Sequence, residues 1–147
     1  MAGKTFVGFG FGAIQAGLFL HEAHLSGNFK RLVVAEVMPD IVEAVRRNGG
    51  VYRINVAAKN GLRKQEVAPV EIFNSTVAAD RQEIIKAIAD ADEICTALPS
   101  VNFYDQGRND DIVSILSAGL ELKMKKTGLP RAIIYTCLLY TSPSPRD

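Results

Sequence analysis

The fold of this chain is decided by the stretch Lys4-Thr5-Phe6-Val7-Gly8-Phe9-Gly10-Phe11-Gly12-Ala13-Ile14-Gln15-Ala16-Gly17. A short apolar strand runs into closely spaced glycines and then into a helix. Such a turn cradles the pyrophosphate of a dinucleotide, because glycine lets the backbone approach the phosphates and the positive helix end faces their charge. Two registers fit: Gly8-x-Gly10-x-x-Ala13 matches G-x-G-x-x-G/A, whereas Gly10-x-Gly12 matches only its first half, with Gln15 in the third position. The candidate contact residues are Gly8, Gly10, Phe11, Gly12, Ala13 and Ile14.

A second strand, expected over Arg31 to Val37, ends near an acidic residue. The run Leu32-Val33-Val34-Ala35 is typical of a parallel strand that is covered on both faces. Glu36 follows it, where a Rossmann unit carries the acid that accepts hydrogen bonds from the adenosine ribose. Its charge would repel a 2′-phosphate, so the sequence predicts NAD rather than NADP as the cofactor. The alternative is that Glu36 is only a solvated residue at the strand end.

Strands and helices alternate along the rest of the chain. This alternation implies a parallel sheet with helices on both faces. We therefore expect an α/β fold, a Rossmann-type doubly wound and mostly parallel sheet. Residues 51–56 and 66–73, joined by a turn at Gly61, suggest a hairpin-like insertion. The expected strands cover 5–9, 31–37, 93–98 and a segment starting at 132–135; the expected helices cover 13–25, a segment from Pro39 to Gly49-Gly50, a segment capped by Asp80, and 110–126.

The first helix has an apolar stripe at helical spacing. Ile14, Gly17, Leu18, His21 and Leu25 share one face, which we expect to lie on the core. Gly17 on that face would let the helix approach the sheet closely.

Composition excludes several classes of function. The chain has 147 residues and a formal net charge of +1, with both signs mixed along it. No basic stripe indicates nucleic-acid binding, and no apolar run is long enough for a membrane span. The sequence starts on the first strand without a secretory signal. These features predict a cytoplasmic α/β protein whose partner is a small molecule.

Few side chains suggest metal or nucleophilic chemistry. Cys95 and Cys137 are far apart and lack metal-type spacing, and Cys95 lies in an apolar strand as a small core residue. His21 and His24 are three residues apart, whereas the H-E-x-x-H zinc motif needs four. We expect His21 to be packed, His24 to be on the surface, and no metal site.

The loop after the strand 93–98 is a second candidate wall of the site. Ligands of open α/β sheets bind at the carboxyl ends of the strands. Ala97 and Leu98 are therefore expected against the adenosine side of the cofactor. Asn102, Tyr104 and Asp105 follow, and two interpretations of Tyr104 stay open: it touches the cofactor or substrate, or it closes the loop over the core.

Four segments together resemble the N-terminal domain of the mannitol-1-phosphate 5-dehydrogenases, which are polyol-specific long-chain dehydrogenases. These are Phe9 to Gly17, Val34-Ala35-Glu36-Val37, Tyr52-Arg53-Ile54-Asn55-Val56 and Thr96-Ala97-Leu98-Pro99. The likeness covers nearly all of residues 4–136. The family pattern usually has a Gly-Arg pair where this chain has Gln15 and Ala16, and usually Asp in place of Glu36.

The resemblance implies hydride transfer between NAD(H) and a sugar phosphate, with fructose 6-phosphate and mannitol 1-phosphate as the pair. In that family the catalytic lysine lies in a C-terminal helical domain, so no catalytic residue is assigned here. Two alternatives remain: a hexuronate or free-polyol dehydrogenase of the same family, and a non-catalytic module that senses NAD. The sequence does not indicate an oligomeric state.

Residues 137–147, Cys-Leu-Leu-Tyr-Thr-Ser-Pro-Ser-Pro-Arg-Asp, differ in composition from the rest. They resemble the conceptual translation of a transposase-end sequencing adapter at every residue. The alternative is a genuine Ser/Pro-rich linker. We therefore expect an incomplete NAD-binding domain over residues 1–136, cut before its last strand, with the catalytic helical domain missing.

Overall fold

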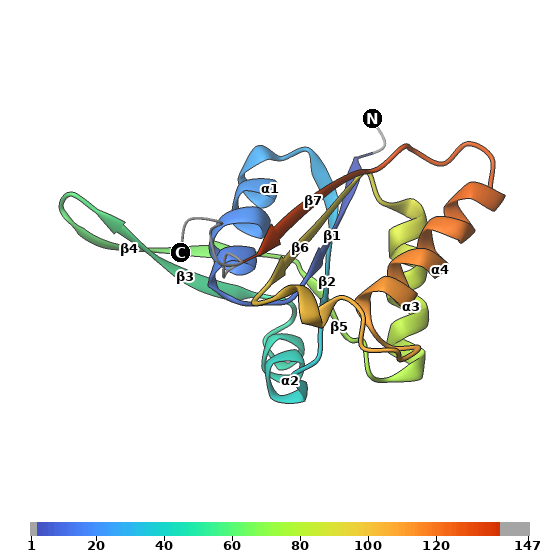
Figure 1. Ribbon diagram of the computed structural model, residues 1–147. Coiled ribbons are helices and arrows are strands. Elements are labelled where there is room, and N and C mark those ends of the chain that lie inside the picture. The colour runs from blue at the N-terminus through green and yellow to red at the C-terminus, as the bar shows by residue number, and fades with distance from the viewer. Residues whose placement is uncertain (1–2, 139–147) are drawn as a thin grey trace, which may run out of the picture.

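A five-stranded parallel sheet forms the centre of the molecule. The computed structural model describes residues 3–138. The strand order is β5-β2-β1-β6-β7 and every pairing is parallel. Helices cover both faces (Figure 1), so the predicted doubly wound, Rossmann-like α/β class is confirmed. The strands are β1 (Lys4–Phe9), β2 (Phe29–Glu36), β5 (Glu71–Asn74), β6 (Glu93–Leu98) and β7 (Ile133–Leu138).

Alternate residues of the central strands feed two separate hydrophobic cores. Phe6 points to the face covered by α1 (Leu20–Ser26) and α2 (Pro39–Arg47). Its neighbour Val7 points to the face covered by α3 (Ala78–Asp90) and α4 (Ile112–Lys125). Because successive side chains of a strand point to opposite faces, an unbroken apolar run fills both cores at once. No helix within residues 3–138 is long and apolar enough to cross a membrane.

The first helix contains a π-turn that the sequence pattern did not predict. In η1 (Gln15–Phe19) the amide of Leu20 donates to the carbonyl of Gln15, which spans five residues instead of four. This extra residue rotates the rest of the helix relative to a regular one. Gln15 and Leu20 therefore face the core, while Gly17, Leu18 and Leu25 are exposed. The predicted stripe was wrong at those three positions.

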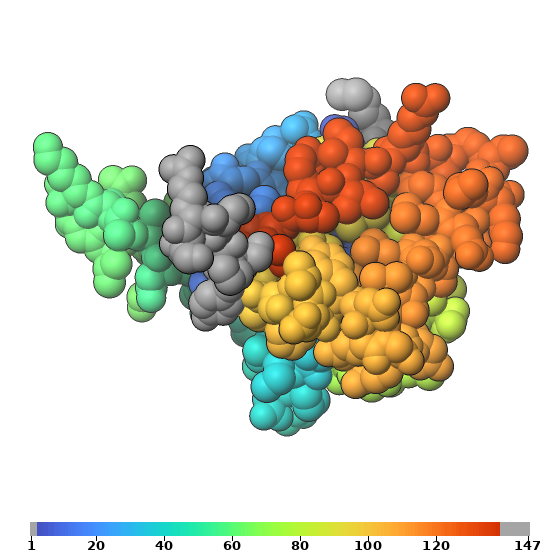
Figure 2. Space-filling model, viewed as in Figure 1, coloured from blue at the N-terminus to red at the C-terminus, as the bar shows by residue number. Residues whose placement is uncertain are grey.

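A two-stranded hairpin leaves the body of the molecule (Figures 1 and 2). It consists of β3 (Tyr52–Ala58) and β4 (Gly61–Val67), which pair antiparallel. The hairpin was predicted, but the expected second strand at 66–73 was wrong in extent. Its first two residues end β4, and its last three belong to β5 of the main sheet. Pro69 lies between them and cannot donate to a ladder.

Three further boundaries differ from expectation. The N-cap of α3 is Val77, and the carboxylate of Asp80 accepts a hydrogen bond from the Asn74 amide at 2.8 Å instead of capping the helix. The helix expected over 110–126 begins at Ile112. Strand β7 continues to Leu138, into the segment expected to be an adapter scar; the rest of that segment lies outside the described residues.

Candidate functional site

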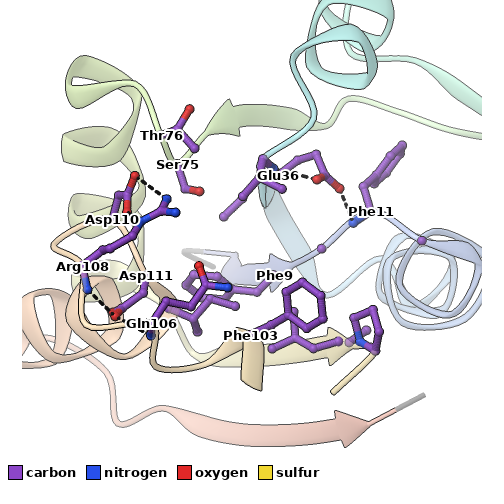
Figure 3. A pocket seen from close by; sticks show the side chains of 18 residues that line it. Phe9, Phe11, Glu36, Ser75, Thr76, Phe103, Gln106, Arg108, Asp110 and Asp111 are labelled. Atoms are coloured by element: carbon purple, nitrogen blue, oxygen red, sulfur yellow. Dashed lines mark hydrogen bonds and ion pairs between the residues drawn. The ribbon is translucent and has the colours of Figure 1, made fainter. Parts of the chain in front are cut away.

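A cavity of about 400 Å³ lies at the carboxyl ends of the central strands. The strand order reverses between β1 and β6, and such a switch point is where open α/β sheets bind ligands. Figure 3 shows Glu36 and Phe11 at one end of the cavity and Arg108 and Asp110 at the other. Six of the nine predicted contact residues line it, namely Gly10, Phe11, Gly12, Glu36, Ala97 and Leu98.

The two glycines of the turn have different structural roles. Gly10 has a φ of +83°, and a Cβ there would lie 2.8 Å from the carbonyl oxygen of Ala97. Its amide donates to Ala35 O at 2.9 Å. Gly12 has no neighbouring atom within 4 Å of a Cβ position, so its open side lies in the cavity wall. The absence of a side chain at Gly10 thus lets the turn lie close to β6, and the absence of one at Gly12 leaves the cavity open at this position.

The other three predicted contact residues, Gly8, Ala13 and Ile14, are not among the described residues that line the cavity. Gly8 is inside β1, and its Cβ position falls against the side chain of Gln15. Ala13 and Ile14 belong to the first helical turn, because the first helical hydrogen bond runs from Ala16 N to Gly12 O. Amides of a first turn have no partner within their helix. The geometry therefore favours the Gly10-x-Gly12 register for contact with a ligand.

Glu36 ties the end of β2 to the glycine turn. Its Oε2 accepts a hydrogen bond from the Phe11 amide at 2.8 Å. Its Oε1 accepts from the amides of Val37 at 2.6 Å and Met38 at 3.1 Å. The side chain is buried, yet it lines the cavity. An ionised carboxylate has about four acceptor positions, so one remains on Oε2 for a ligand hydroxyl.

The ring of Phe11 connects the turn to the β3–β4 hairpin. It packs edge-to-face on Tyr52, with ring centroids 5.0 Å apart. The Tyr52 hydroxyl donates to Ala16 O at 2.6 Å. Burial raises the pKa of Tyr52 well above its usual range, so the hydroxyl stays protonated as a donor. The base of the hairpin thus braces the turn from outside.

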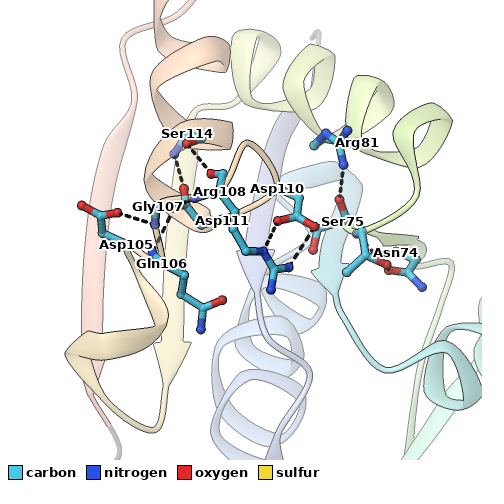
Figure 4. Close-up of polar contacts among 11 residues, drawn as sticks. Asn74, Ser75, Arg81, Asp105, Gln106, Gly107, Arg108, Asp110, Asp111 and Ser114 are labelled. Atoms are coloured by element: carbon cyan, nitrogen blue, oxygen red, sulfur yellow. Dashed lines mark hydrogen bonds and ion pairs between the residues drawn. The ribbon is translucent and has the colours of Figure 1, made fainter.

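The loop between β6 and α4 forms the far wall, as expected of this loop from the sequence, but its lining residues Gln106, Arg108, Asp110 and Asp111 were missed by sequence reasoning. Asp111 accepts hydrogen bonds from the amides of Gln106 and Arg108, each at 3.1 Å, and of Ser114 at 2.8 Å (Figure 4). Hydrogen bonds from Ser114, above all, lower the pKa of Asp111 to about 2. Arg108 binds Asp110 through two contacts of 2.7 and 2.9 Å. Asp111 is the N-cap residue of α4, and an Asp directly before an apolar helical run is a helix-start signal that could have indicated it.

Three other residues that the sequence analysis considered, Tyr104, His21 and Cys95, are not among the described residues that line the cavity. The Tyr104 hydroxyl lies 2.5 Å from Thr96 Oγ1 and is absent from the described cavity lining, so it closes the loop over the strand end. His21 is buried with its Nδ1 3.4 Å from a Glu22 carboxylate oxygen. Burial raises the pKa of the Cys95 thiol to about 12, which suits a core residue. Within residues 3–138, no three His, Cys, Asp or Glu side chains gather as metal ligands.

Comparison with known proteins adds no assignment. Neither a scan against protein-family models nor a search among curated proteins finds a match to this chain. The chemistry of the site therefore has to be inferred from its geometry: a glycine turn at a helix start, a carboxylate at the end of β2, and an apolar cavity between them.

Proposed function

We propose that this domain binds NAD(H) as the cofactor half of an oxidoreductase. One observation carries the proposal: the open Gly12 at the start of the first helix and the Glu36 carboxylate line one cavity, at the switch point of a doubly wound sheet. The helix start supplies unpaired amides and a positive dipole end for a pyrophosphate. The carboxylate supplies an acceptor for ribose hydroxyls.

The residues of the cavity fit the parts of such a cofactor. Gly10 and Gly12 would face the pyrophosphate, and Glu36 would hold the adenosine ribose. The apolar side chains of Val37, Leu98 and Phe103 offer walls for a flat base. When bound, the nicotinamide supplies a hydride or accepts one; the residues described here bind and orient the cofactor.

The charges of the cavity support NAD over NADP. Glu36, Asp110 and Asp111 are carboxylates in the lining, and Arg108 is the single cation among its described residues. Asp110 already binds that guanidinium by two contacts. A 2′-phosphate would therefore meet net negative charge and no unpaired cation.

The substrate part of the proposal rests on the resemblance to polyol-phosphate dehydrogenases. We propose a sugar phosphate of the mannitol 1-phosphate and fructose 6-phosphate type as substrate, and the cytoplasm as location. Catalytic side chains would come from a part of the protein beyond this domain.

Equilibrium titration of the 147-residue chain with NAD and with NADP tests the proposal. We expect NAD to bind more tightly by about tenfold or more, since like charges 4 Å apart repel by about 1 kcal/mol in water and about 4 kcal/mol near a protein surface. Glu36→Gln keeps the size of the side chain and removes its charge, so the preference for NAD should narrow. A wild-type chain that binds NADP as tightly as NAD would contradict the assignment.

A further inference from the structure

Gln15 occupies the third position of the glycine pattern and is fully buried under the turn. Its Nε2 donates to the carbonyl oxygens of Phe9 and Cys95, each at 3.2 Å. Phe9 ends β1 and Cys95 belongs to β6, the two strands that meet at the switch point. One carboxamide thus links both halves of the sheet directly beneath the turn.

The glycine that allows this arrangement lies on the strand. The third glycine of the usual pattern permits close packing of helix and strand, and a glutamine there needs extra room. A Cβ on Gly8 would lie 2.7 Å from both Cδ and Nε2 of Gln15, so only glycine at position 8 leaves space for the carboxamide. The π-turn over Gln15–Phe19 separates Gln15 from the next fully buried residue of the helix, Leu20, by five positions, so both side chains face the core.

Only the donor group of the Gln15 carboxamide makes hydrogen bonds among the described residues. Its Oε1 is buried with no hydrogen-bond partner among the described residues. An unpaired buried acceptor is unfavourable, so an apolar side chain of the same length would fill the space at lower cost. Glutamine differs from such an apolar side chain in that its Nε2 donates to the carbonyl oxygens of Phe9 and Cys95.

We propose that Gln15 is a positioning residue: through Gly8, Phe9 and Cys95 it fixes the glycine turn in the conformation that receives a pyrophosphate. This inference rests on the proposed function. It gives a positioning role to a buried side chain at the place where the usual pattern has its third glycine.

The test compares Gln15→Met with the wild-type chain by titration with NAD, ADP and adenosine. Methionine keeps the length of the side chain and removes both donated hydrogen bonds. We expect the affinities for NAD and ADP to fall by about tenfold, the equivalent of one to two hydrogen bonds. The affinity for adenosine, which has no pyrophosphate, should stay unchanged.

Lys123→Met is the matched control. The Lys123 Nζ also donates to two carbonyl oxygens, those of Ala91 and Pro130, both at 2.7 Å. These lie before β6 and β7, at the opposite end of the sheet. This variant should lose stability with the relative affinities for the three ligands unchanged.

The outcomes separate the two proposals. If Gln15→Met does not fold, Gly8→Ala displaces the same carboxamide from the strand side and should cause the same selective loss. Equal loss for all three ligands, or no loss, in a protein whose wild type binds NAD overturns the role of Gln15 alone. A wild-type chain that binds neither NAD nor ADP overturns the proposed function, and this inference with it.

Discussion

Two glycines only two residues apart in the turn should respond to substitution in opposite ways. Gly10 has a left-handed φ and a carbonyl oxygen at its Cβ position, whereas Gly12 has neither. Gly10→Ala should therefore lower the free energy of unfolding by about 1–3 kcal/mol. Gly12→Val should leave stability nearly unchanged and abolish NAD binding, because its side chain enters the cavity.

Urea unfolding and NAD titration of both variants measure these effects. A Gly12→Val variant that binds NAD normally would show that the turn does not hold the cofactor. The matched substitution is Gly17→Val, at an exposed glycine that also has an open Cβ position and no left-handed φ and that does not line the cavity; it separates a general cost of valine at a glycine position from a local effect on binding.

The Glu36 carboxylate should stabilise the fold as well as select the cofactor. Glu36→Ala leaves the amides of Phe11, Val37 and Met38 without their acceptor. We expect a loss of about 1–3 kcal/mol in the free energy of unfolding, and a smaller loss for Glu36→Gln, which retains one acceptor oxygen. Chemical denaturation of both variants measures the difference. Equal stability of Glu36→Ala and wild type would show that the hydrogen bonds accepted by Glu36 do not stabilise the turn.

At this scale the sequence indicated only what a pattern can encode. The positions of Gly10 and Gly12 in a turn after β1 and of Glu36 at the end of β2 were predictable, since a strand, a glycine turn and a strand-end acid recur at set spacing. The pairing of Gly8 with Gln15 was not predictable, because it depends on which side chain a π-turn brings beneath the sheet.

Among the elements, the β3–β4 hairpin is attached to the body at its base, through Tyr52 at the start of β3 and the buried Val67 at the end of β4. Tyr52→Phe removes the hydrogen bond to Ala16 O and keeps the ring contact with Phe11. We expect a loss of about 1 kcal/mol in the free energy of unfolding, and faster hydrogen exchange of the hairpin amides. Unchanged exchange in the hairpin would show that Tyr52 does not anchor it.

The cap of α4 should make stability depend on acid. The pKa of Asp111 is about 2 in the folded chain and 3.8 ordinarily. Between about pH 4 and pH 2 the unfolded chain takes up this proton and the folded chain does not, so stability falls as pH falls. The asparagine of the Asp111→Asn variant does not titrate, so the variant lacks this source of pH dependence. Its stability should therefore approach that of wild type through this range, as followed by urea unfolding at several pH values. If the stabilities of the variant and the wild type changed with pH in the same way, the hydrogen bonds to Asp111 would not be the cause of its low pKa.

Element types were largely predictable from the sequence, and element boundaries were less so. Continuous apolar runs identified β2 and β6. The interrupted segment 66–73 was read as one strand, because local pattern does not show that its two ends pair with different sheets. The π-turn likewise leaves no period in the sequence.

At the scale of the whole molecule, β7 is the least covered strand. It pairs with β6 alone among the described strands, and Ile133, Ile134 and Tyr135 are 57%, 41% and 43% exposed. Open apolar sheet edges promote association. The 147-residue chain should therefore self-associate, and Ile133→Lys should reduce this, as measured by sedimentation velocity. Met124→Lys, at an exposed apolar residue of α4, is the control. A wild-type chain that stays monomeric at high concentration would contradict the prediction.

The architecture and the use of the β6–α4 loop as a cavity wall follow from the order of elements, but the residues of that loop that line the cavity do not. Alternating strands and helices, with right-handed crossovers, allow few sheet orders. The loop of Gln106 to Asp111 reaches the cavity only through its own hydrogen bonds and its place before α4. Such long-range placement has no local signal in the sequence.

The contact between Tyr52 and Phe11 also gives the protein a built-in optical probe. The chain contains no tryptophan, so a single indole introduced by Tyr52→Trp would emit alone when it is excited at wavelengths that tyrosine does not absorb. Placed against the residue whose amide Glu36 holds, that indole would report by its emission wavelength and lifetime whether the turn moves when a nucleotide arrives. Stopped-flow mixing could then time that motion directly.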